Sequence, residues 1–527
     1  MRYTHRDLSQ GNTILFLFLC FFPLFVFTNY SNIPHMKMVC FVVLLACFAV
    51  LAPFGAYSQK KKPRQYPLEW KQYTPDFILL FFLFTTLLSA LLSADLNDPN
   101  GLVFIGAGRH DGWLFLLAYA ALFFLTSRFC HFKRAHLIAF AIVVFAMCFI
   151  AVVQLCGNNF LGLYPQSKYT GFPNLFFSTI GNADIMGGFM CMATPIIGVG
   201  YVVFRLSKGM RAFFLLAHTL CIYIMIKIEV DMALVGLAAL VAVMTPLLLR
   251  NLTYVKRVLD VGASLALGLA FTGLVQHNYN KKLQLTTNLL EPSNFFYLCF
   301  GAAVLLVAIR LAVEYLPMKW LSYKVLRWSV LGAEVALVIA TFCYFRFVMV
   351  DCPEKEGLVK DLYELVRGQL SMTAGHHRVG IWKNAIDMGK RNPIFGTGSG
   401  TFAKNFKKYA AEVGYGRYAN RNLDFAHNEY IHYFCTTGIL GAGSYLAFLL
   451  SVVWQAMKRL AKNPKILVLG SAVLGYSVQV FFCFSVVIAA PFFWLFLGLL
   501  VGEIRATMVA EKVESARLDT REYDLAQ

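Results

Sequence analysis

Long apolar segments separated by short polar breaks recur throughout this chain of 527 residues. The hydrocarbon core of a bilayer is about 30 Å thick, and an α-helix crosses it with about 20 apolar residues. Windows of that length occur about fourteen times, and 58% of the residues are hydrophobic while 14% are charged. A soluble domain is about half apolar and about a quarter charged. The sequence therefore predicts an all-α polytopic membrane protein with about fourteen transmembrane helices.

The first apolar window follows a short basic start, but no Ala-x-Ala cleavage site follows it, so we expect it to be retained as a helix. The expected spans are 13–30, 38–57, 76–93, 113–127, 136–156, 183–204, 212–228, 232–249, 258–276, 294–313, 329–348, 428–457, 466–487 and 489–507.

The positive charges predict an orientation for these spans. The chain has a formal net charge of +19, which could indicate a nucleic-acid partner. However, Lys and Arg gather in alternate short loops, and such loops stay in the cytoplasm. The basic clusters occupy 60–64, 128–134, 205–211, 250–257, 319–327 and 458–465. This pattern predicts a multi-pass membrane protein with both termini cytoplasmic and no nucleic-acid partner.

One long polar stretch, residues 349–426, falls on the outer face in this topology. Apolar residues with helical spacing at 358–366 and 381–388 predict short helices within this large extracytoplasmic loop. The predicted organisation is therefore transmembrane helices 1–11 in residues 1–348, an extracytoplasmic loop in 349–426, where chemistry could take place, helices 12–14 in 427–507 and a cytoplasmic tail in 508–527. Thirteen scattered cysteines without a Cys-x-x-Cys pair predict neither a zinc site nor a disulfide framework.

Four sequence elements in the outer loop and the following helix form an ordered pattern. They are Arg378 with Trp382 four residues later, Pro393-Ile394-Phe395-Gly396-Thr397-Gly398, His427-Asn428, and Thr437-Gly438-Ile439-Leu440-Gly441. This order resembles the O-antigen ligase and O-antigen polymerase superfamily. Two upstream segments are similar to further elements of that family, namely Gly108-Arg109-His110-Asp111-Gly112 and Gly181-Asn182-Ala183-Asp184. The resemblance covers about residues 105–450 and is dense from 376 to 446.

The resemblance implies a membrane-embedded glycosyltransferase that works outside the cytoplasmic membrane. Such an enzyme moves a glycan from an undecaprenyl pyrophosphate carrier to a glycan, lipid or protein acceptor. The family implies inversion at the transferred sugar, no metal and no cofactor. Its substrates and the surrounding membrane lipids are the implied partners.

The matched residues suit this chemistry. Guanidinium groups bind phosphate oxygens bidentately, so Arg378 is the first candidate to stabilise the leaving pyrophosphate and Arg109 is the second. An imidazole can accept the proton of an attacking hydroxyl, which makes His427 the candidate general base. The same likeness assigns substrate binding to Arg109, Asn428, Trp382, Asn182 and Asp184.

Each of these residues also has a plainer interpretation. An arginine at a helix end can be an interfacial anchor, a histidine near the surface can be merely solvated, and Asp184 can cap a helix. The run Gly396–Gly400 lacks the spacing of a nucleotide-binding loop and predicts a tight turn.

Two departures from the family pattern concern the donor site. The family's Ser-Arg element is missing where this chain has Asp231-Met232, and Asp184 replaces the second Asn of Gly-Asn-x-Asn. Ligase and polymerase activity remain equally compatible with the pattern. A polytopic transporter or flippase of lipid-linked glycans is an alternative, although it would favour internal repeats, which the sequence lacks. A catalytically inactive scaffold is a third alternative.

Overall fold

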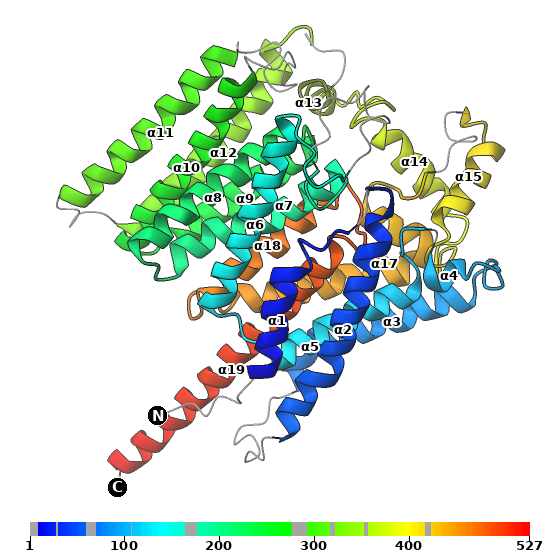
Figure 1. The fold of residues 1–527 in the computed structure, drawn as a ribbon, viewed down its shortest axis with the longest axis horizontal. Helices are drawn as coiled ribbons and strands as arrows, with labels where there is room; N and C mark the ends of the chain where they lie inside the picture. The colour runs from blue at the N-terminus through cyan, green and yellow to red at the C-terminus, as the bar shows by residue number, and fades with distance from the viewer. Residues whose placement is uncertain are drawn as a thin grey trace.

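The computed structural model describes residues 9–27, 30–58, 70–106, 108–163, 177–276, 292–316, 322–352, 357–416 and 423–526. Helices make up all of the regular structure in these ranges. Figure 1 shows long helices gathered into one bundle, with shorter helices at one end.

Each of the fourteen predicted ranges contains one α-helix. These helices are α1 (Ser9–Phe21), α2 (Ile33–Ser58), α3 (Thr74–Leu91), α5 (Trp113–Phe129), α6 (Arg134–Leu155), α7 (Ala183–Val203), α8 (Lys208–Lys227), α9 (Asp231–Leu248), α10 (Leu252–Gln276), α11 (Pro292–Tyr315), α12 (Tyr323–Cys343), α17 (Glu429–Met457), α18 (Lys465–Gln479) and α19 (Ala490–Ala526).

The number of spans is smaller than predicted. Within the described residues, ten helices are long and apolar enough to cross a membrane, while α1, α5 and α18 are shorter apolar helices. The predicted span 13–30 ends early because α1 stops before Pro23, which disfavours helical geometry in the preceding residue. Similarly, α18 stops at Gln479, well before the predicted end at residue 487.

Helix α7 lies at the centre of the bundle, where the whole apolar window is buried. It packs against α18, α8 and α9. Glycines permit this close approach, because a Cβ at Gly475 of α18 would lie 2.1 Å from the carbonyl oxygen of Cys191. Small residues are the usual means by which membrane helices approach each other. The central position of α7 fixes its N-terminus, with Asn182 and Asp184, at the end of the bundle that carries the short helices.

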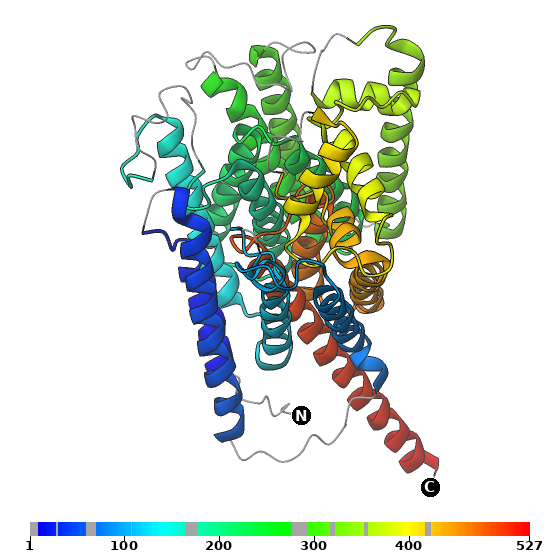
Figure 2. The same ribbon diagram turned by 90° about the vertical axis from the view of Figure 1, so that its right-hand side faces the viewer.

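In the described part of the segment between α12 and α17 there are four shorter helical elements. They are η4 (Tyr344–Val348), α13 (Leu358–Arg367), α14 (Arg378–Gly389) and α15 (Phe402–Glu412). Helices α13 and α14 occupy the two stretches where apolar spacing predicts them. A further short helix, α4 (Leu102–Ile105), leads into the Arg109 loop. In Figure 2 the α13 end of the molecule is opposite the C-terminal end of α19.

The C-terminal helix is longer than the sequence predicts. Helix α19 continues without interruption from Ala490 to Ala526, so the expected tail at 508–527 is helical throughout its described part. Glu511 of α19 pairs with Arg459 at 3.4 Å and with Lys462 at 3.0 Å. These contacts join the basic loop between α17 and α18 to the extended end of α19.

Candidate active site

His427 lies immediately before α17 and has a left-handed backbone conformation, with φ of 50°. Two neighbours hold this turn. The Asn428 side chain accepts a hydrogen bond of 3.0 Å from the Ile431 backbone N–H, which caps α17. The Trp382 indole N–H of α14 donates to the His427 carbonyl oxygen at 3.2 Å. Trp382, the fourth residue after Arg378, thus positions the backbone of His427.

Arg378 is the first residue of α14, and its side chain is buried. One guanidinium nitrogen donates to the Gly375 carbonyl oxygen at 3.3 Å. Another lies 3.7 Å from a carboxylate oxygen of Asp184, at the start of α7. The buried Nε has no hydrogen-bond partner in the described part of the chain. Arg378 therefore retains donor capacity in a site where an unsatisfied donor is costly.

Arg109 reaches the same place from the loop between α4 and α5. Its Nε donates to a carboxylate oxygen of Asp424 at 2.9 Å. Its guanidinium carbon lies 5.5 Å from the centre of the Phe484 ring, and the His427 ring is 5.2 Å from that ring. Phe484 therefore connects Arg109 with His427.

The electrostatics of His427 show which charges surround it. The pKa of His427 is lowered to about 4, chiefly by burial and also by the cationic groups of Arg378 and Arg109, while Asp184 and Asp424 oppose this shift. The imidazole is therefore neutral at ordinary pH. Its buried Nδ1 has no hydrogen-bond partner among the described residues. A neutral imidazole between two arginines can accept a proton beside a bound anion.

The predicted binding residues divide into two groups. Asp184 faces Arg378, while the capping role considered for it belongs to Asn182, whose side chain accepts a 3.1 Å hydrogen bond from Ile185 N–H. Asn182 and Asn428 thus use their amide oxygens to start the two helices that bring Asp184 and His427 to the site. The structure brings Arg109, Arg378, Asp184 and His427 together.

Asp424 and Phe484 are members of the site that sequence reasoning missed. Asp424 precedes His427 by three residues but belongs to none of the recognised elements. Phe484 lies in the non-helical stretch after α18, a segment that its hydropathy assigned to a membrane span. Its closeness to His427 along the sequence could have indicated Asp424 as a site residue. The sequence holds no comparable signal for Phe484.

The two glycine-containing elements, the turn at 393–398 and the segment 437–441 of α17, pair with each other through backbone hydrogen bonds. Helix α17 is broken at Gly438, where φ is 66° and ψ is −171°. The Thr397 N–H donates to the Cys435 carbonyl oxygen at 3.0 Å, and the Ile439 N–H donates to the Pro393 carbonyl oxygen at 2.8 Å. The Pro393–Gly398 turn thus satisfies backbone groups that the helix break leaves unpaired. This is the tight turn that the sequence predicts in place of a nucleotide loop.

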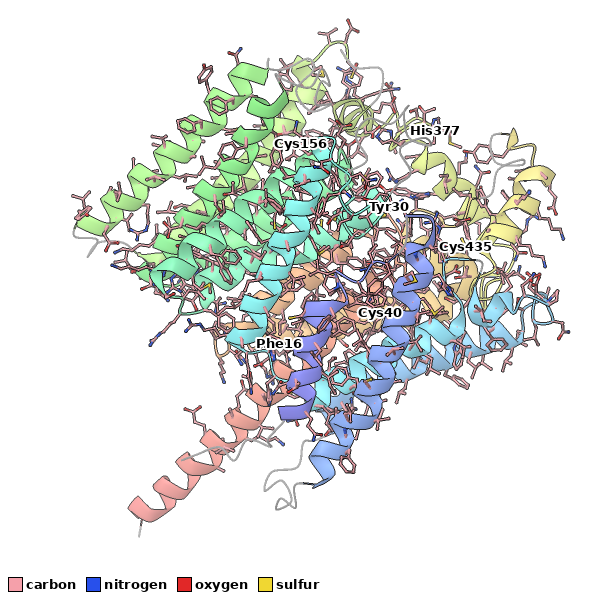
Figure 3. All side chains as sticks on the ribbon, in the orientation of Figure 1. Phe16, Tyr30, Cys40, Cys156, His377 and Cys435 are labelled. Atoms are coloured by element: carbon pink, nitrogen blue, oxygen red, sulfur yellow. The ribbon has the colours of Figure 1, made fainter. Side chains whose placement is uncertain are left out.

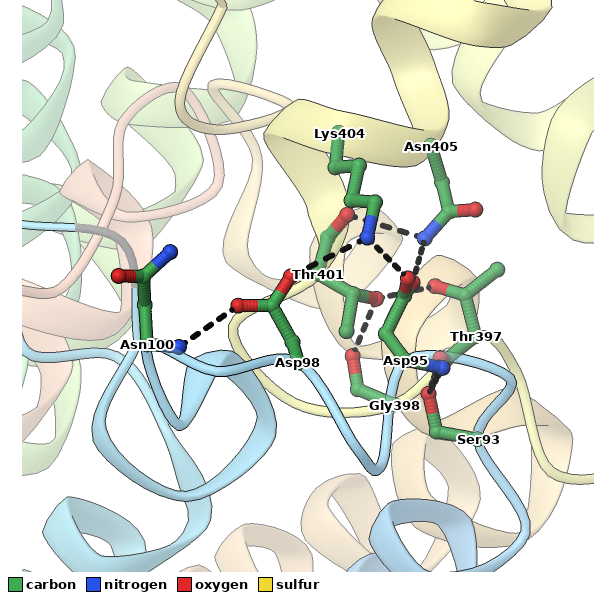
Figure 4. Close-up of polar contacts among 9 residues, drawn as sticks. All are labelled: Ser93, Asp95, Asp98, Asn100, Thr397, Gly398, Thr401, Lys404 and Asn405. Atoms are coloured by element: carbon green, nitrogen blue, oxygen red, sulfur yellow. Dashed lines mark hydrogen bonds and ion pairs between the residues drawn. The ribbon is translucent and has the colours of Figure 1, made fainter.

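A polar network anchors the far side of this turn (Figure 4). The Lys404 ammonium group of α15 lies 2.6 Å from Asp95 and 3.2 Å from Asp98, both in the segment after α3. The Asn405 amide donates to Asp95 at 3.0 Å. These contacts tie α15 to the segment that leads into the Arg109 loop. They therefore link two parts of the chain that contribute to the site.

The described residues contain no group of three or more His, Cys, Asp or Glu side chains that could hold a metal ion. The cysteines are free thiols. Figure 3 shows three of them on separate elements, with Cys40 on α2, Cys156 at the end of α6 and Cys435 on α17.

The family model described as O-Antigen ligase matches residues 293–446. This range contains Arg378, Trp382, His427 and Asn428, together with the glycine-containing elements at 393–398 and 437–441. Arg109, Asn182 and Asp184 lie outside it, and the fold brings Arg109 and Asp184 into contact with Asp424 and Arg378 of this range. A search of the curated proteins finds no match to this chain.

Proposed function

We propose that the chain, whose residues 293–446 match the O-antigen ligase family model, is a membrane-embedded, inverting, metal-independent glycosyltransferase. It transfers a glycan from undecaprenyl pyrophosphate to a hydroxyl group of an acceptor. The reaction takes place at the outer face of the bacterial cytoplasmic membrane, and both termini are cytoplasmic. The acceptor is a glycan, a lipid or a protein, so the activity is of the ligase or the polymerase type.

The observation that carries this proposal is the gathering of two arginines around one neutral imidazole. Arg378 and Arg109 both lower the pKa of His427, and the two carboxylates Asp184 and Asp424 hold them beside it. A leaving pyrophosphate gains negative charge in the transition state, and preorganised guanidinium donors stabilise that charge. A transporter has no need for a base at this position.

The residues support a balanced transfer step. His427 accepts the proton of the acceptor hydroxyl as its oxygen attacks the anomeric carbon from the face opposite the pyrophosphate. The bond between that carbon and the phosphate oxygen breaks, and undecaprenyl pyrophosphate leaves with the electron pair, so the configuration inverts. The bound pyrophosphate offsets the positive charge of Arg378 and Arg109. Donor binding therefore raises the pKa of His427 and stabilises the imidazolium that forms.

The test is glycan transfer by the purified chain, supplied with a lipid-linked donor and an acceptor. We expect His427→Ala to reduce transfer about 10²–10⁴-fold, because general-base catalysis contributes a factor of that size. Donor binding should change much less, since the imidazole acts mainly in the transition state.

The matched control is His131→Ala, because His131 lies beside Glu503 of α19, away from the described site. It should retain wild-type transfer. Transfer that persists unchanged in His427→Ala would remove His427 from the mechanism. The absence of transfer by the wild-type chain with every donor and acceptor class would favour a transporter or a scaffold.

A further inference from the structure

His376 lies in the turn that leads into α14, two residues before Arg378. Its side chain is 48% exposed, so a ligand can reach it. His376 and His377 both have left-handed backbone conformations, with φ of 55° and 70°. Such conformations cost roughly 1–3 kcal/mol for residues other than glycine and persist only where the surroundings enforce them. Figure 3 shows His377 at the end of the molecule that carries α14.

Neighbouring side chains enforce this turn. Asp361 of α13 accepts a hydrogen bond of 2.9 Å from the Gly375 backbone N–H. Arg378 donates to the Gly375 carbonyl oxygen at 3.3 Å. The same peptide segment that displays His376 is thus fixed to Arg378 from one side and to α13 from the other.

His376 is paired with a buried carboxylate. Its Nε2 lies 3.5 Å from Oδ2 of Asp231, the first residue of α9. Asp231 is only 8% exposed, and this oxygen has no hydrogen-bond partner in the described ranges. A buried charge requires a counter-charge. The imidazolium form of His376 provides one.

Three charged groups face His376, and each comes from a different helix. Asp231 of α9 and Asp361 of α13 favour the imidazolium, while Arg378 of α14 opposes it. The pKa of His376 is raised above its ordinary value, chiefly by its contact with the Asp231 carboxylate, although burial lowers it. A raised pKa means that His376 keeps its positive charge to a higher pH than an ordinary histidine and loses it as the pH rises further.

We propose that His376 is a pH-dependent cation of the donor site, which binds the pyrophosphate of the lipid-linked donor together with Arg378. Asp231 is its positioning residue. The inference deepens the proposed function and rests on it for the identity of the ligand.

The geometry gives Arg378 a central place in this site. Arg378 acts electrostatically on His427 and also on His376. A pyrophosphate presents two linked phosphate groups, and charge-assisted hydrogen bonds to each of them are stronger than neutral ones. One phosphate group contacts Arg109 and Arg378 beside His427, where the sugar is transferred. The other contacts Arg378 and His376.

The test measures binding of undecaprenyl pyrophosphate to the purified full-length chain in detergent at pH 6 and pH 8. We expect the wild type to bind about tenfold more tightly at pH 6, because one charge-assisted hydrogen bond is lost when His376 deprotonates. His376→Ala should bind at pH 6 with the weaker, high-pH affinity of the wild type. His376→Arg should keep the tight affinity at both pH values.

The arginine variant is also the control for titration of the ligand itself, since the ligand's own protonation affects both proteins equally. Asp231→Asn should shift the wild-type transition to lower pH, because it removes the main cause of the raised pKa. Thermal unfolding of each variant separates misfolding from loss of binding. If one variant misfolds, the comparison of wild type with His376→Arg still decides the result.

Several outcomes overturn the inference. Equal affinity and equal pH dependence in wild type and His376→Ala would do so, as would a His376→Arg variant that follows the wild-type pH profile. A wild-type chain that binds the ligand in this way but transfers no glycan would leave the inference standing and would contradict the proposed transfer. The two proposals are therefore distinguishable.

Discussion

Arg378 illustrates how much of this site depends on a single side chain. It begins α14, approaches Asp184 of α7 at 3.7 Å and lowers the pKa of His427. Its buried Nε has no protein partner in the described residues. A planar fork with a spare donor matches the oxygens of a phosphate, whereas an ammonium group acts as a point charge.

The substitution Arg378→Lys keeps the charge but removes the bidentate geometry. We expect it to reduce glycan transfer at least a hundredfold, because loss of one transition-state donor costs about 2.7–4 kcal/mol. The amount of membrane-inserted protein should stay unchanged. Transfer by purified protein, normalised to its concentration, measures the effect.

Arg391→Lys is the matched control for this prediction. Arg391 follows α14 and pairs with Glu412 on an exposed surface, with a side chain that is 50% exposed. Exposed ion pairs contribute little, so this variant should transfer glycan at the wild-type rate. Near-normal transfer by Arg378→Lys would reduce Arg378 to an interfacial anchor.

At the scale of elements, the break in α17 joins this helix to the turn at 393–398. The turn at 393–398 enters the break at Gly438 and pairs with it through backbone hydrogen bonds. A Cβ at Gly438 would lie 2.1 Å from the Ile394 carbonyl oxygen, and one at Gly396 would lie 2.5 Å from the Thr437 nitrogen. Glycine is therefore required at both positions, because a side chain on either one would collide with the backbone of the other element.

Gly438→Ala should destabilise the protein by more than about 2 kcal/mol, because it combines a left-handed backbone with a steric clash. Gly443→Ala is the control on the same helix, since a Cβ there meets no atom within 4 Å. The control should stabilise the protein by up to about 1 kcal/mol. Thermal unfolding in detergent compares the two variants. Equal unfolding midpoints would show that the pairing of the 393–398 turn with the break in α17 does not contribute to stability.

At the scale of the whole molecule, the proposed active site and the C-terminal end of α19 lie at opposite ends of the bundle (Figure 2). The basic loop between α17 and α18 pairs with Glu511, about midway along α19. Basic loops remain in the cytoplasm. This arrangement supports an outer position for the site.

Reporter fusions test this orientation. Alkaline phosphatase, which is active only outside the cytoplasm, should be active when fused at Gly357 and inactive when fused at Lys462. A cytoplasmic reporter at the same positions should give the reverse pattern and serves as the control. Activity at Lys462 with silence at Gly357 would invert the topology and place His427 in the cytoplasm.

The sequence by itself determined the local features of this protein. Apolar windows located fourteen helices, because a helix in lipid must satisfy its backbone within one continuous apolar segment. The ordered elements from Arg378 to Gly441 predicted the O-antigen ligase family, which the matched range 293–446 confirms. They also included Arg378 and His427, which meet in the fold.

Only the tertiary structure decided which of the candidates meet and which groups each one contacts. Asn182 and Asn428 cap helices. Asp424 and Phe484 contact Arg109 in the site, and His376 lies beside Asp231. These contacts connect α7, α9, α14 and the segments around α5, α17 and α18, which are far apart along the chain. Hydrophobic periodicity reports how each segment faces its surroundings but carries no information on which segments pack together. Packing around the buried helix α7 decides that, and with it the electrostatics of His427.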